Sequence, residues 1–367
     1  MDTLREVGNG FNLKRKMSIF ERSFKNPILK PNSEHDWESL KVYNPGVIYD
    51  GGIYHMFYRA RGKDWVSSIG YAVSVDGEKF TKFEKPVLLA EDSQEKKGVE
   101  DPRVTKLGDK YFMAYAAFDG EEVRLNIATS DDLKKWTKQG KAFCNFEFLK
   151  NGGNRLRYKD GQFVNRNDKA RGKEWSKSGA IFPKKIGGKY RMLFGEHNIW
   201  LAESDDGFKW NTLDGVYLSP RSEEFFDCTL VEMGPPPLLI SNGWLVLYHG
   251  VDKYRVYRIG FLILDINNPR KILYRSVAPI FGPQEPYELS GIVDILPGGY
   301  KEMEKMSKEK PQEFINMHLK SGTMPQVVFC NGAVLVGDTL RIYYGAGDTY
   351  ICTATAKLGD ILSRYNI

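Results

Sequence analysis

Apolar and polar residues alternate in short runs along most of the chain, and many of these runs follow a turn that contains glycine. Alternation with a period of two is typical of strands that have one buried face, and glycine marks the turns between them. Five of the runs share one pattern, in which the alternating apolar residues end in an aromatic residue. These five runs occupy residues 50–60, 107–117, 186–196, 241–250 and 336–346.

A second strand is predicted after each of the five runs, and a further apolar strand is predicted before each. The second strands are expected at residues 69–77, 125–132, 199–207, 259–265 and 350–356. In the first three repeats, an aspartate turn then leads to an aromatic residue, namely Phe80, Trp136 or Trp210. Each repeat is therefore predicted to be a unit of about four short strands.

Repeats of this length indicate an architecture in which similar units pack against one another. A single four-stranded meander cannot bury both of its faces, but radial stacking lets neighbouring units cover them. The pattern therefore predicts an all-β fold, a five-bladed β-propeller. Residues 26–367 are expected to form this single catalytic domain, after an N-terminal extension at residues 1–25. The site of such a fold is expected on the central axis.

Two segments interrupt the repeats. Residues 145–176 are polar and charged, which indicates a long loop between blades. Residues 299–321 are expected to be partly helical, and Pro311 is expected to divide them into two short helices. This segment could be a solvated insertion, a lid or a subunit contact. Its interrupted apolar stripe consists of Met303, Met306, Phe314, Met317 and Leu319.

Composition agrees with a β protein and excludes some functions. Aromatic residues make up 13% of the chain and there are 36 glycines, which favours strands and turns. The net charge of +6 is spread along the chain without a basic tract, so no nucleic-acid partner is expected. The four cysteines lie far apart without a CxxC pair, so neither a metal site nor a disulfide framework is expected. Without an apolar N-terminal segment or a membrane span, we expect a cytoplasmic protein and no membrane partner.

The clearest candidate for chemistry is Gly-Val-Glu-Asp-Pro-Arg-Val at residues 98–104. Glu100, Asp101 and Arg103 come directly before an inner strand of the second repeat. Other ionisable side chains lie at or near the ends of the core strands in the remaining repeats: Arg59, Arg61, Glu196, His249 and Asp348. Equivalent positions in equivalent blades fall on one rim, so we expect these side chains to converge.

Carboxylates that face each other across a polar pocket suit the cleavage of glycosidic bonds. One carboxylic acid protonates the leaving oxygen, while another group or an incoming nucleophile acts on the opposite face of the sugar. Aromatic residues near the rim could stack on sugar rings or could pack the blades together. These aromatic residues are Tyr43, Tyr58, Trp65, Tyr287 and Tyr344.

An ordered set of motifs from about Asn26 to Leu362 resembles glycoside hydrolase family 130, the β-mannoside phosphorylases and mannosidases built on a five-bladed propeller. The motifs are Tyr43-Asn-Pro-Gly, Phe57-Tyr-Arg-Ala, Glu100-Asp-Pro-Arg, Ser178-Gly-Ala-Ile-Phe-Pro, Gly234-Pro-Pro-Pro, Tyr248-His-Gly-Val, Pro286-Tyr-Glu and Tyr343-Tyr-Gly-Ala-Gly-Asp-Thr. The resemblance implies that Asp101 is the general acid of an inverting enzyme. In the phosphorylases the proton is thought to pass through a hydroxyl of the bound mannose.

The resemblance also implies a set of substrate-binding residues, and Arg103 is expected to orient the acidic pair. The substrate-binding set is Asn44, Arg59, Glu100, Arg103, Lys177, His249, Tyr287 and Asp348.

The chain departs from the phosphorylases at two positions where they carry basic, phosphate-binding residues. Where they commonly read His-Arg-Pro, this chain reads Phe194-Gly-Glu-His-Asn, and before the triple proline it reads Leu230-Val-Glu-Met-Gly. The acidic residues that stand there, Glu196 and Glu232, would repel phosphate and are suited to deprotonating water. The departures therefore favour the hydrolytic branch of the family, which acts on β-1,2-linked mannosides.

Three functions remain open from the sequence. The first is an inverting β-mannosidase, with Asp101 as acid and Glu196 or Glu232 as base. The second is an inverting β-mannoside phosphorylase that releases α-mannose 1-phosphate, with His249, Lys177 and Arg59 around the phosphate. The third is a non-catalytic sugar-binding propeller, which the retention of Asp101 disfavours. The expected partner is a manno-oligosaccharide. We expect no cofactor and no metal. Inorganic phosphate would be a co-substrate only in the second case. The sequence leaves open whether the protein forms a homo-oligomer.

Overall fold

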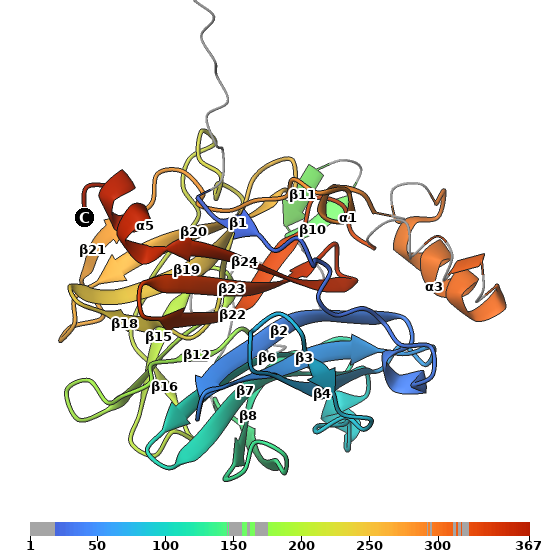
Figure 1. The fold of residues 1–367 in the computed structure, drawn as a ribbon, viewed down its shortest axis with the longest axis horizontal. Helices are drawn as coiled ribbons and strands as arrows, with labels where there is room; N and C mark the ends of the chain where they lie inside the picture. Colours follow the sequence, from blue (N-terminus) through green and yellow to red (C-terminus); the bar gives the residue numbers. More distant parts are fainter. Residues whose placement is uncertain are drawn as a thin grey trace, which may run out of the picture.

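The computed structural model describes residues 19–144, 146, 156–159, 162–165, 175–291, 293, 296–310, 313–314, 317 and 323–367. The described strands form antiparallel units that follow one another along the chain (Figure 1). The first unit contains β2 (Lys41–Asp50), β3 (Ile53–Arg61), β4 (Ser67–Ser74) and β5 (Thr81–Lys82). The second unit contains β6 (Gly98–Leu107), β7 (Lys110–Phe118), β8 (Val123–Ser130) and β9 (Thr137–Lys141).

The later units repeat this order. The third contains β12 (Ala180–Ile181), β13 (Tyr190–Phe194), β15 (Trp200–Ser204) and β16 (Asn211–Thr212). The fourth contains β17 (Leu230–Met233), β18 (Leu238–Ile240), β19 (Gly243–Val251), β20 (Tyr257–Leu264) and β21 (Ile272–Arg275), and β14 (Glu196–His197) joins its sheet. The fifth contains β22 (Val328–Val336), β23 (Thr339–Ala346) and β24 (Tyr350–Lys357). All five predicted runs and their five following strands are confirmed.

The fifth unit is completed by the N-terminal strand β1 (Glu21–Arg22), which pairs with β24. Phe20, beside this strand, is buried in the core between the fourth and fifth units. Residues 19–25, which the sequence analysis assigned to an extension, therefore belong in part to the last sheet. Because β1 precedes β2 directly in the chain, this pairing ties the last unit to the first.

The hydrophobic core consists mainly of five clusters, and each cluster lies between two units. The first and second units share Phe57 and Met113, and the fifth and first units share Tyr343 and Met56. The other three clusters join the second to the third unit, the third to the fourth, and the fourth to the fifth. Each unit thus covers the faces of its two neighbours, which is the arrangement that the predicted radial stacking requires.

Close contacts between the first strands of the units depend on glycine. A Cβ atom on Gly46 of β2 would lie 2.4 Å from the carbonyl oxygen of Pro102 in β6. A Cβ atom on Gly332 of β22 would lie 2.9 Å from the carbonyl oxygen of Pro45 in β2. These first strands therefore approach one another more closely than residues with a side chain would allow.

A buried acid recurs at the same place in four units, where it accepts a hydrogen bond from a core-strand tyrosine and pairs with a basic residue of an outer strand. The four sets are Tyr58–Glu38–Lys82, Tyr115–Glu95–Lys138, Tyr248–Asp227–Arg275 and Tyr344–Glu288–Arg22. We call each set a tyrosine–acid latch. In the third unit, Phe194 takes the place of the tyrosine and packs against Phe143 and Phe146.

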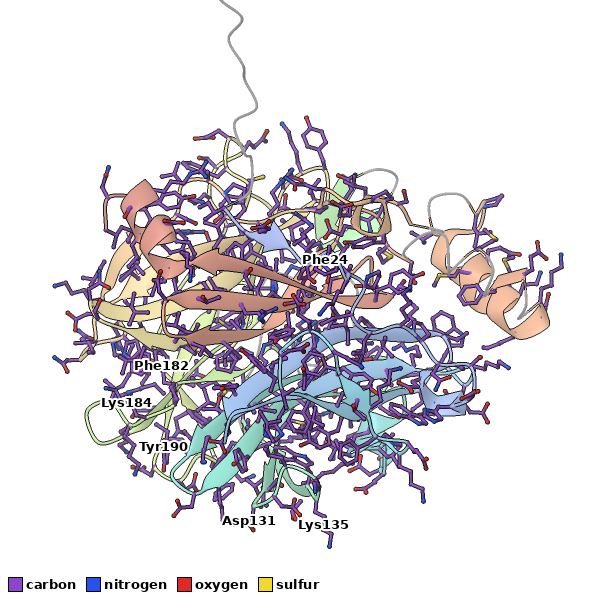
Figure 2. The ribbon with its side chains drawn as sticks, viewed as in Figure 1. Phe24, Asp131, Lys135, Phe182, Lys184 and Tyr190 are labelled. Atoms are coloured by element: carbon purple, nitrogen blue, oxygen red, sulfur yellow. The ribbon has the colours of Figure 1, made fainter. Side chains whose placement is uncertain are left out.

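Turns at the periphery are also repeated. Ser74, Ser130 and Ser204 each bond to the aspartate two residues later, and that aspartate accepts backbone N–H groups of the turn. Figure 2 shows Asp131 and Lys135, which mark the turn after β8, at the outer edge of the molecule. These aspartates hold the turns and lie away from the centre.

The two segments that interrupt the repeats are only partly described. Residues 145–176 were expected to be a loop, but they contain the hairpin of β10 (Leu156–Lys159) and β11 (Gln162–Asn165). Helix α3 (Gly299–Glu309) confirms the predicted helical character, and Figure 1 shows it standing off one side of the sheets. Pro311 and Leu319 lie outside the described residues. In α3 Met303 and Met306 are buried together with Phe314, Leu40 and Trp65, so the insertion covers part of the first unit.

Two more short helices, α1 (Pro286–Leu289) and α5 (Leu358–Arg364), were not predicted. Among the described residues, no helix has the length and apolar character needed to cross a membrane.

Candidate active site

Asp101 lies at a bulge of β6, where the pairing register with β7 shifts between Glu100 and Arg103. Its backbone has a φ of 53°, and 3% of the residue surface is exposed. The side chain of Asn44, at the corresponding bulge of β2, donates from Nδ2 to Asp101 Oδ1 over 2.8 Å. The two bulges therefore aim an amide and a carboxyl group at each other across neighbouring units.

Glu100 and Asp101 share one guanidinium group. Arg59 donates from Nη1 to Asp101 Oδ1 over 3.2 Å and from Nη2 to Glu100 Oε1. Glu100 Oε1 also accepts hydrogen bonds from Arg61 over 3.1 Å and from the hydroxyl of Ser67 over 3.0 Å. Arg59 of β3 thus bridges the two neighbouring acids, and Arg61 of the same strand adds a second cation beside Glu100.

Lys177 lies between three carboxylates. Its Nζ atom is 3.1 Å from Glu232 Oε1, 3.7 Å from Asp101 Oδ2 and 3.9 Å from Glu196 Oε1. The sum of the last two distances is an upper limit on the separation of the Asp101 and Glu196 oxygens. That limit means that the two carboxyl groups are no farther apart than those of inverting glycosidases, which are separated by roughly 6.5–9.5 Å.

The two glutamates stand directly opposite each other, because Glu196 of β14 is the pairing partner of Glu232 in β17. Like charges at such positions destabilise a sheet unless other groups compensate them. Trp175 donates from Nε1 to Glu196 Oε2 over 2.8 Å, and the Ser178 hydroxyl donates to Glu232 Oε1 over 2.7 Å. Together with Lys177, these donors come from one short segment, which we call the 175–178 segment.

Burial and charge push the pKa values of Asp101 and Glu232 apart. Burial alone would raise the pKa of Asp101, but the charges of Arg59 and Lys177 and the Asn44 hydrogen bond lower it below its usual range. Burial raises the pKa of Glu232 to about 7, although Lys177 acts in the opposite direction. Burial disfavours the charged form of Lys177, yet the surrounding carboxylates hold its pKa well above the usual value.

His249 is fully buried and neutral. Its Nε2 atom accepts a hydrogen bond from the backbone N–H of Cys330 over 2.8 Å, which places the ring proton on Nδ1. The ring stacks on Phe329 at 4.1 Å, and burial together with the charge of Arg103 lowers its pKa to about 3. Nδ1 is buried as well and has no hydrogen-bond partner among the described residues.

Arg103 and Tyr287, which were expected to contact the substrate, are surrounded by groups of the protein core. Arg103 is buried and donates to the backbone oxygens of Asp101, Met233 and Gly234, so it joins the second unit to the fourth instead of orienting the acidic pair. Tyr287 of α1 packs against the core between the fourth and fifth units, near Arg22 and Glu288. Both arrangements favour a structural role.

Asp348 interacts electrostatically with the charged residues around Asp101. It follows β23, its backbone has a φ of 53°, and its charge interacts with Arg59, Asp101 and the buried Lys41. Burial raises the pKa of Asp348, and the positive charges of Lys41 and Arg59 act against that rise. Asp348 and Asp101 are therefore close enough for their charges to interact.

Several residues of the site were missed in the sequence. Tyr257 is half-buried, and burial together with the charges of Glu232 and Glu196 raises the pKa of its phenol. Trp175 and Ser178 hold the two glutamates. Ser178 could have been found from the sequence, because it is the first residue of a family motif. Trp175 could not, because the sequence before it has no strand pattern.

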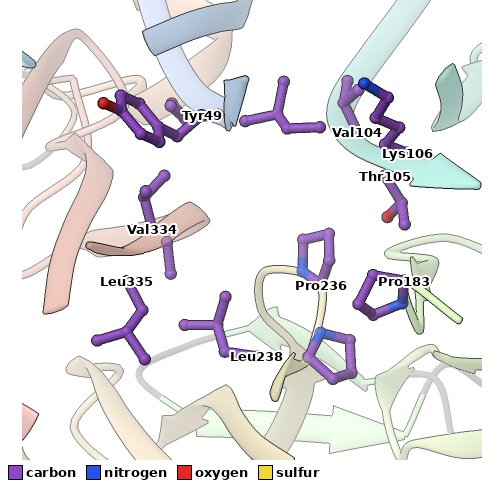
Figure 3. A pocket seen from close by; sticks show the side chains of 13 residues that line it. Tyr49, Val104, Thr105, Lys106, Pro183, Pro236, Leu238, Val334 and Leu335 are labelled. Carbon is purple, nitrogen blue, oxygen red and sulfur yellow. The ribbon is translucent and has the colours of Figure 1, made fainter. Parts of the chain in front are cut away.

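A separate pocket of about 230 Å³ lies at the other end of the same first strands (Figure 3). All five units contribute to its apolar wall, for example with Val104, Pro183 and Leu335. Thr105 lies four residues beyond Asp101, which corresponds to roughly 13 Å along a strand. The pocket contains no carboxylate among its lining residues, so the candidate chemistry lies at the opposite end.

Acidic side chains grouped on the rim of a β structure are characteristic of enzymes that cleave or form glycosidic bonds. The chain belongs to one family of such enzymes, glycoside hydrolase family 130, described as beta-1,4-mannooligosaccharide phosphorylase, which matches residues 19–296. The protein is therefore an enzyme of the glycosidase and glycoside phosphorylase type.

Relatives of both types are similar to the chain. A beta-1,2-mannobiose phosphorylase of Thermoanaerobacter sp. (strain X514) is 36% identical over 90% of this chain and 95% of its own. A solved glycosyl hydrolase of Bacteroides ovatus is 27% identical with a TM-score of 0.72, over 92% of this chain and 93% of its own. Another solved structure, described in connection with glycoside hydrolases that target beta-1,2 mannosidic linkages in Candida mannan, is 28% identical with a TM-score of 0.71 and the same two coverages.

Proposed function

We propose that the protein is an inverting glycoside hydrolase that cleaves β-mannosides, with β-1,2-linked manno-oligosaccharides as the preferred substrates. The observation that carries this proposal is the position of Lys177 between Asp101, Glu196 and Glu232. Three carboxyl groups around one ammonium leave no excess of positive charge for an anion. Phosphate, with a charge near −2, is disfavoured there, whereas a water molecule is not.

The residues that a phosphorylase would use for phosphate are engaged elsewhere. Arg59 is bound to Glu100 and Asp101, and His249 is neutral. Lys177 is surrounded by carboxylates. A phosphate ion would have to compete with these carboxylates for each cation.

In the proposed reaction, water attacks the anomeric carbon of the mannose as the bond to the leaving oxygen breaks. Asp101 supplies the proton to the leaving oxygen, by way of a mannose hydroxyl if the family resemblance holds. Glu196 or Glu232 takes the proton of the water. After turnover the base holds the proton of the water while Asp101 has lost its own, and Lys177, which lies between them, is suited to relay a proton back to Asp101. Because the pKa of Asp101 lies below its usual range, its carboxyl is ionised in the free enzyme, and the proposed role as acid requires it to regain a proton before each cycle.

The remaining rim residues are proposed to bind the mannose that donates its anomeric carbon. Glu100, Asp348 and Asn44 offer acceptors or an amide to hydroxyl groups, and His249 offers its Nδ1 proton. Arg59 holds Glu100 and Asp101 in position and is proposed to reach a hydroxyl from the same place.

We also propose that the five units form a five-bladed propeller whose axis carries this rim. The core clusters support this proposal, because they connect each unit to the next and the fifth to the first. The pairing of β1 with β24 supports closure of the ring. The carboxylates then lie at one end of the axis and the apolar pocket at the other.

A phosphorylase is the second candidate, and the observation in its favour is the 36% identity to a beta-1,2-mannobiose phosphorylase. The test is incubation with β-1,2-mannobiose in buffer with and without inorganic phosphate, followed by separation of the products. We expect free mannose at the same rate in both buffers. Mannose 1-phosphate as the main product, with little mannose when phosphate is left out, would overturn the hydrolase proposal.

A further inference from the structure

The two glutamates that face each other differ in what surrounds them, although either could act as the base by residue type. The side chain of Glu232 is 1% exposed and that of Glu196 is 15% exposed. Water and sugar must reach the base, so access favours Glu196. Glu232 lies deeper, under Lys177.

Glu196 is held by Trp175, and the position of Trp175 is set independently of Glu196. Trp175 forms a parallel bridge with Val123 at the start of β8, and the backbone N–H of Ser176 donates to the Val123 oxygen over 2.9 Å. The Ser176 hydroxyl accepts the backbone N–H of Leu125 over 3.0 Å. The backbone of Trp175 is thus fixed to the second unit, its ring packs against the core between the second and third units, and its N–H points to a carboxylate that follows the third.

The indole donor also distinguishes the two oxygens of Glu196. Oε2 accepts the N–H of Trp175 over 2.8 Å, while Oε1 is the oxygen directed to Lys177 and, beyond it, to Asp101. A hydrogen bond to the ionised form favours that form. The indole therefore stabilises Glu196 as a carboxylate and turns Oε1 towards the space between the two acids.

Glu232 has the opposite arrangement. Its Oε1 atom takes both the Ser178 hydroxyl and the closest approach of Lys177, and the group is buried. Such a carboxyl is suited to holding the ammonium in place and is poorly placed to receive a proton from a water molecule beside the sugar.

We propose that Glu196 is the base that activates the water, that Trp175 is the residue that positions it, and that Glu232 is a buried partner that holds Lys177. This inference rests on the proposed hydrolase function. In the step concerned, the water oxygen forms its bond to the anomeric carbon, the glycosidic bond breaks, and the water proton passes to Glu196 Oε1. Asp101 provides the proton of the leaving oxygen, so atoms and charges balance.

The first test is Trp175→Phe, which removes the N–H and keeps an aromatic ring. We expect kcat to fall about 10- to 100-fold, which corresponds to the loss of one hydrogen bond to a charged group. KM should change by no more than about twofold, and the acid limb of the pH profile should move to higher pH. The matched control is Trp136→Phe, because the indole of Trp136 donates to the Leu133 oxygen at the periphery, and its kinetics should be unchanged.

The second test separates the two glutamates with azide. Azide needs no base, so it can replace water in a variant that lacks one. We expect azide to restore turnover of Glu196→Ala on an aryl β-mannoside, with an inverted mannosyl azide as product, and not to restore Glu232→Ala. Rescue of Glu232→Ala alone, or an unchanged kcat in Trp175→Phe, would overturn the inference. The wild-type enzyme in phosphate-free buffer is run in parallel, because failure to release mannose there would instead overturn the hydrolase function.

Discussion

Replacing Lys177 by methionine tests whether its charge sets the ionisation of the carboxyls around it. The variant keeps the length of the side chain and removes the ammonium that lies 3.1–3.9 Å from Glu232, Asp101 and Glu196. Unit charges about 4 Å apart interact by about 4 kcal/mol at an effective dielectric constant of about 20. One pKa unit corresponds to about 1.4 kcal/mol, so the largest shift to be expected is about three units.

The expected shift is smaller, about one to two units, because other donors stay in place. Asp101 keeps Arg59 and Asn44, and Glu232 keeps Ser178. The base must be ionised to accept a proton, and loss of a nearby cation raises the pKa of a carboxyl. The acid limb of kcat/KM against pH should therefore move up by about one to two units, with partial recovery of activity at high pH.

The measurement is mannose release from β-1,2-mannobiose across a pH series. The matched control is Lys82→Met, because Lys82 pairs with the buried Glu38 over 3.0 Å in a tyrosine–acid latch. That variant should be less stable but should keep the pH profile of the wild type. An unmoved acid limb in Lys177→Met would refute the electrostatic role. Loss of activity at every pH without a shift would assign Lys177 to a substrate or phosphate contact.

Three further outcomes are expected. Asp101→Asn should lower kcat by about 10²- to 10⁴-fold while leaving the fold intact, since an amide cannot supply the proton, and a kcat near that of the wild type would remove Asp101 from this role. Glu232→Gln should remove the inflection near pH 7 from the rate profile, because burial raises the pKa of Glu232 to about 7, and an unchanged inflection would contradict this origin. Tyr344→Phe should lower the free energy of unfolding by about 1–3 kcal/mol in a denaturant titration, because it takes one donor from the buried Glu288. The exposed Tyr254→Phe is its control, and equal stabilities would show that this latch contributes nothing.

The sequence predicted the parts of the fold that are governed by repetition. Alternating apolar runs located the core strand and the following strand of every unit, because their buried faces impose a period of two. The contribution of residues 19–25 was missed, since β1 has only two residues and carries no pattern of its own. The tyrosine–acid latches were also missed, because an isolated acid before a strand looks like a surface charge until its partners are known.

The site was predictable where a residue's place in a repeat decides where its side chain lies. Asp101 and Glu196, which the repeat places near equivalent strand ends, both lie within 4 Å of Lys177, and so does Glu232, which was singled out only as a departure from the phosphorylase motif. The prediction was weaker for Arg103, because an arginine beside two acids suggests ion pairs, whereas its partners are carbonyl oxygens of the fourth unit. Sequence spacing does not reveal backbone acceptors that come from another unit.

The third unit departs from the repeat and also provides much of the chemistry. It has phenylalanine at position 194 where the others have the latch tyrosine, and an aromatic cluster packs there instead. In the first, second and fourth units, the latch acid lies six residues before the residue that corresponds to Asp101, as Glu95 does. In the third unit Ser178 corresponds to Asp101, and the residue six positions before it is a glycine. Because this unit has no tyrosine–acid latch, the residues directly before β12 make other contacts. Its 175–178 segment turns Trp175, Lys177 and Ser178 towards the two glutamates, so the unit without the latch acid is the one that positions Glu196 and Glu232.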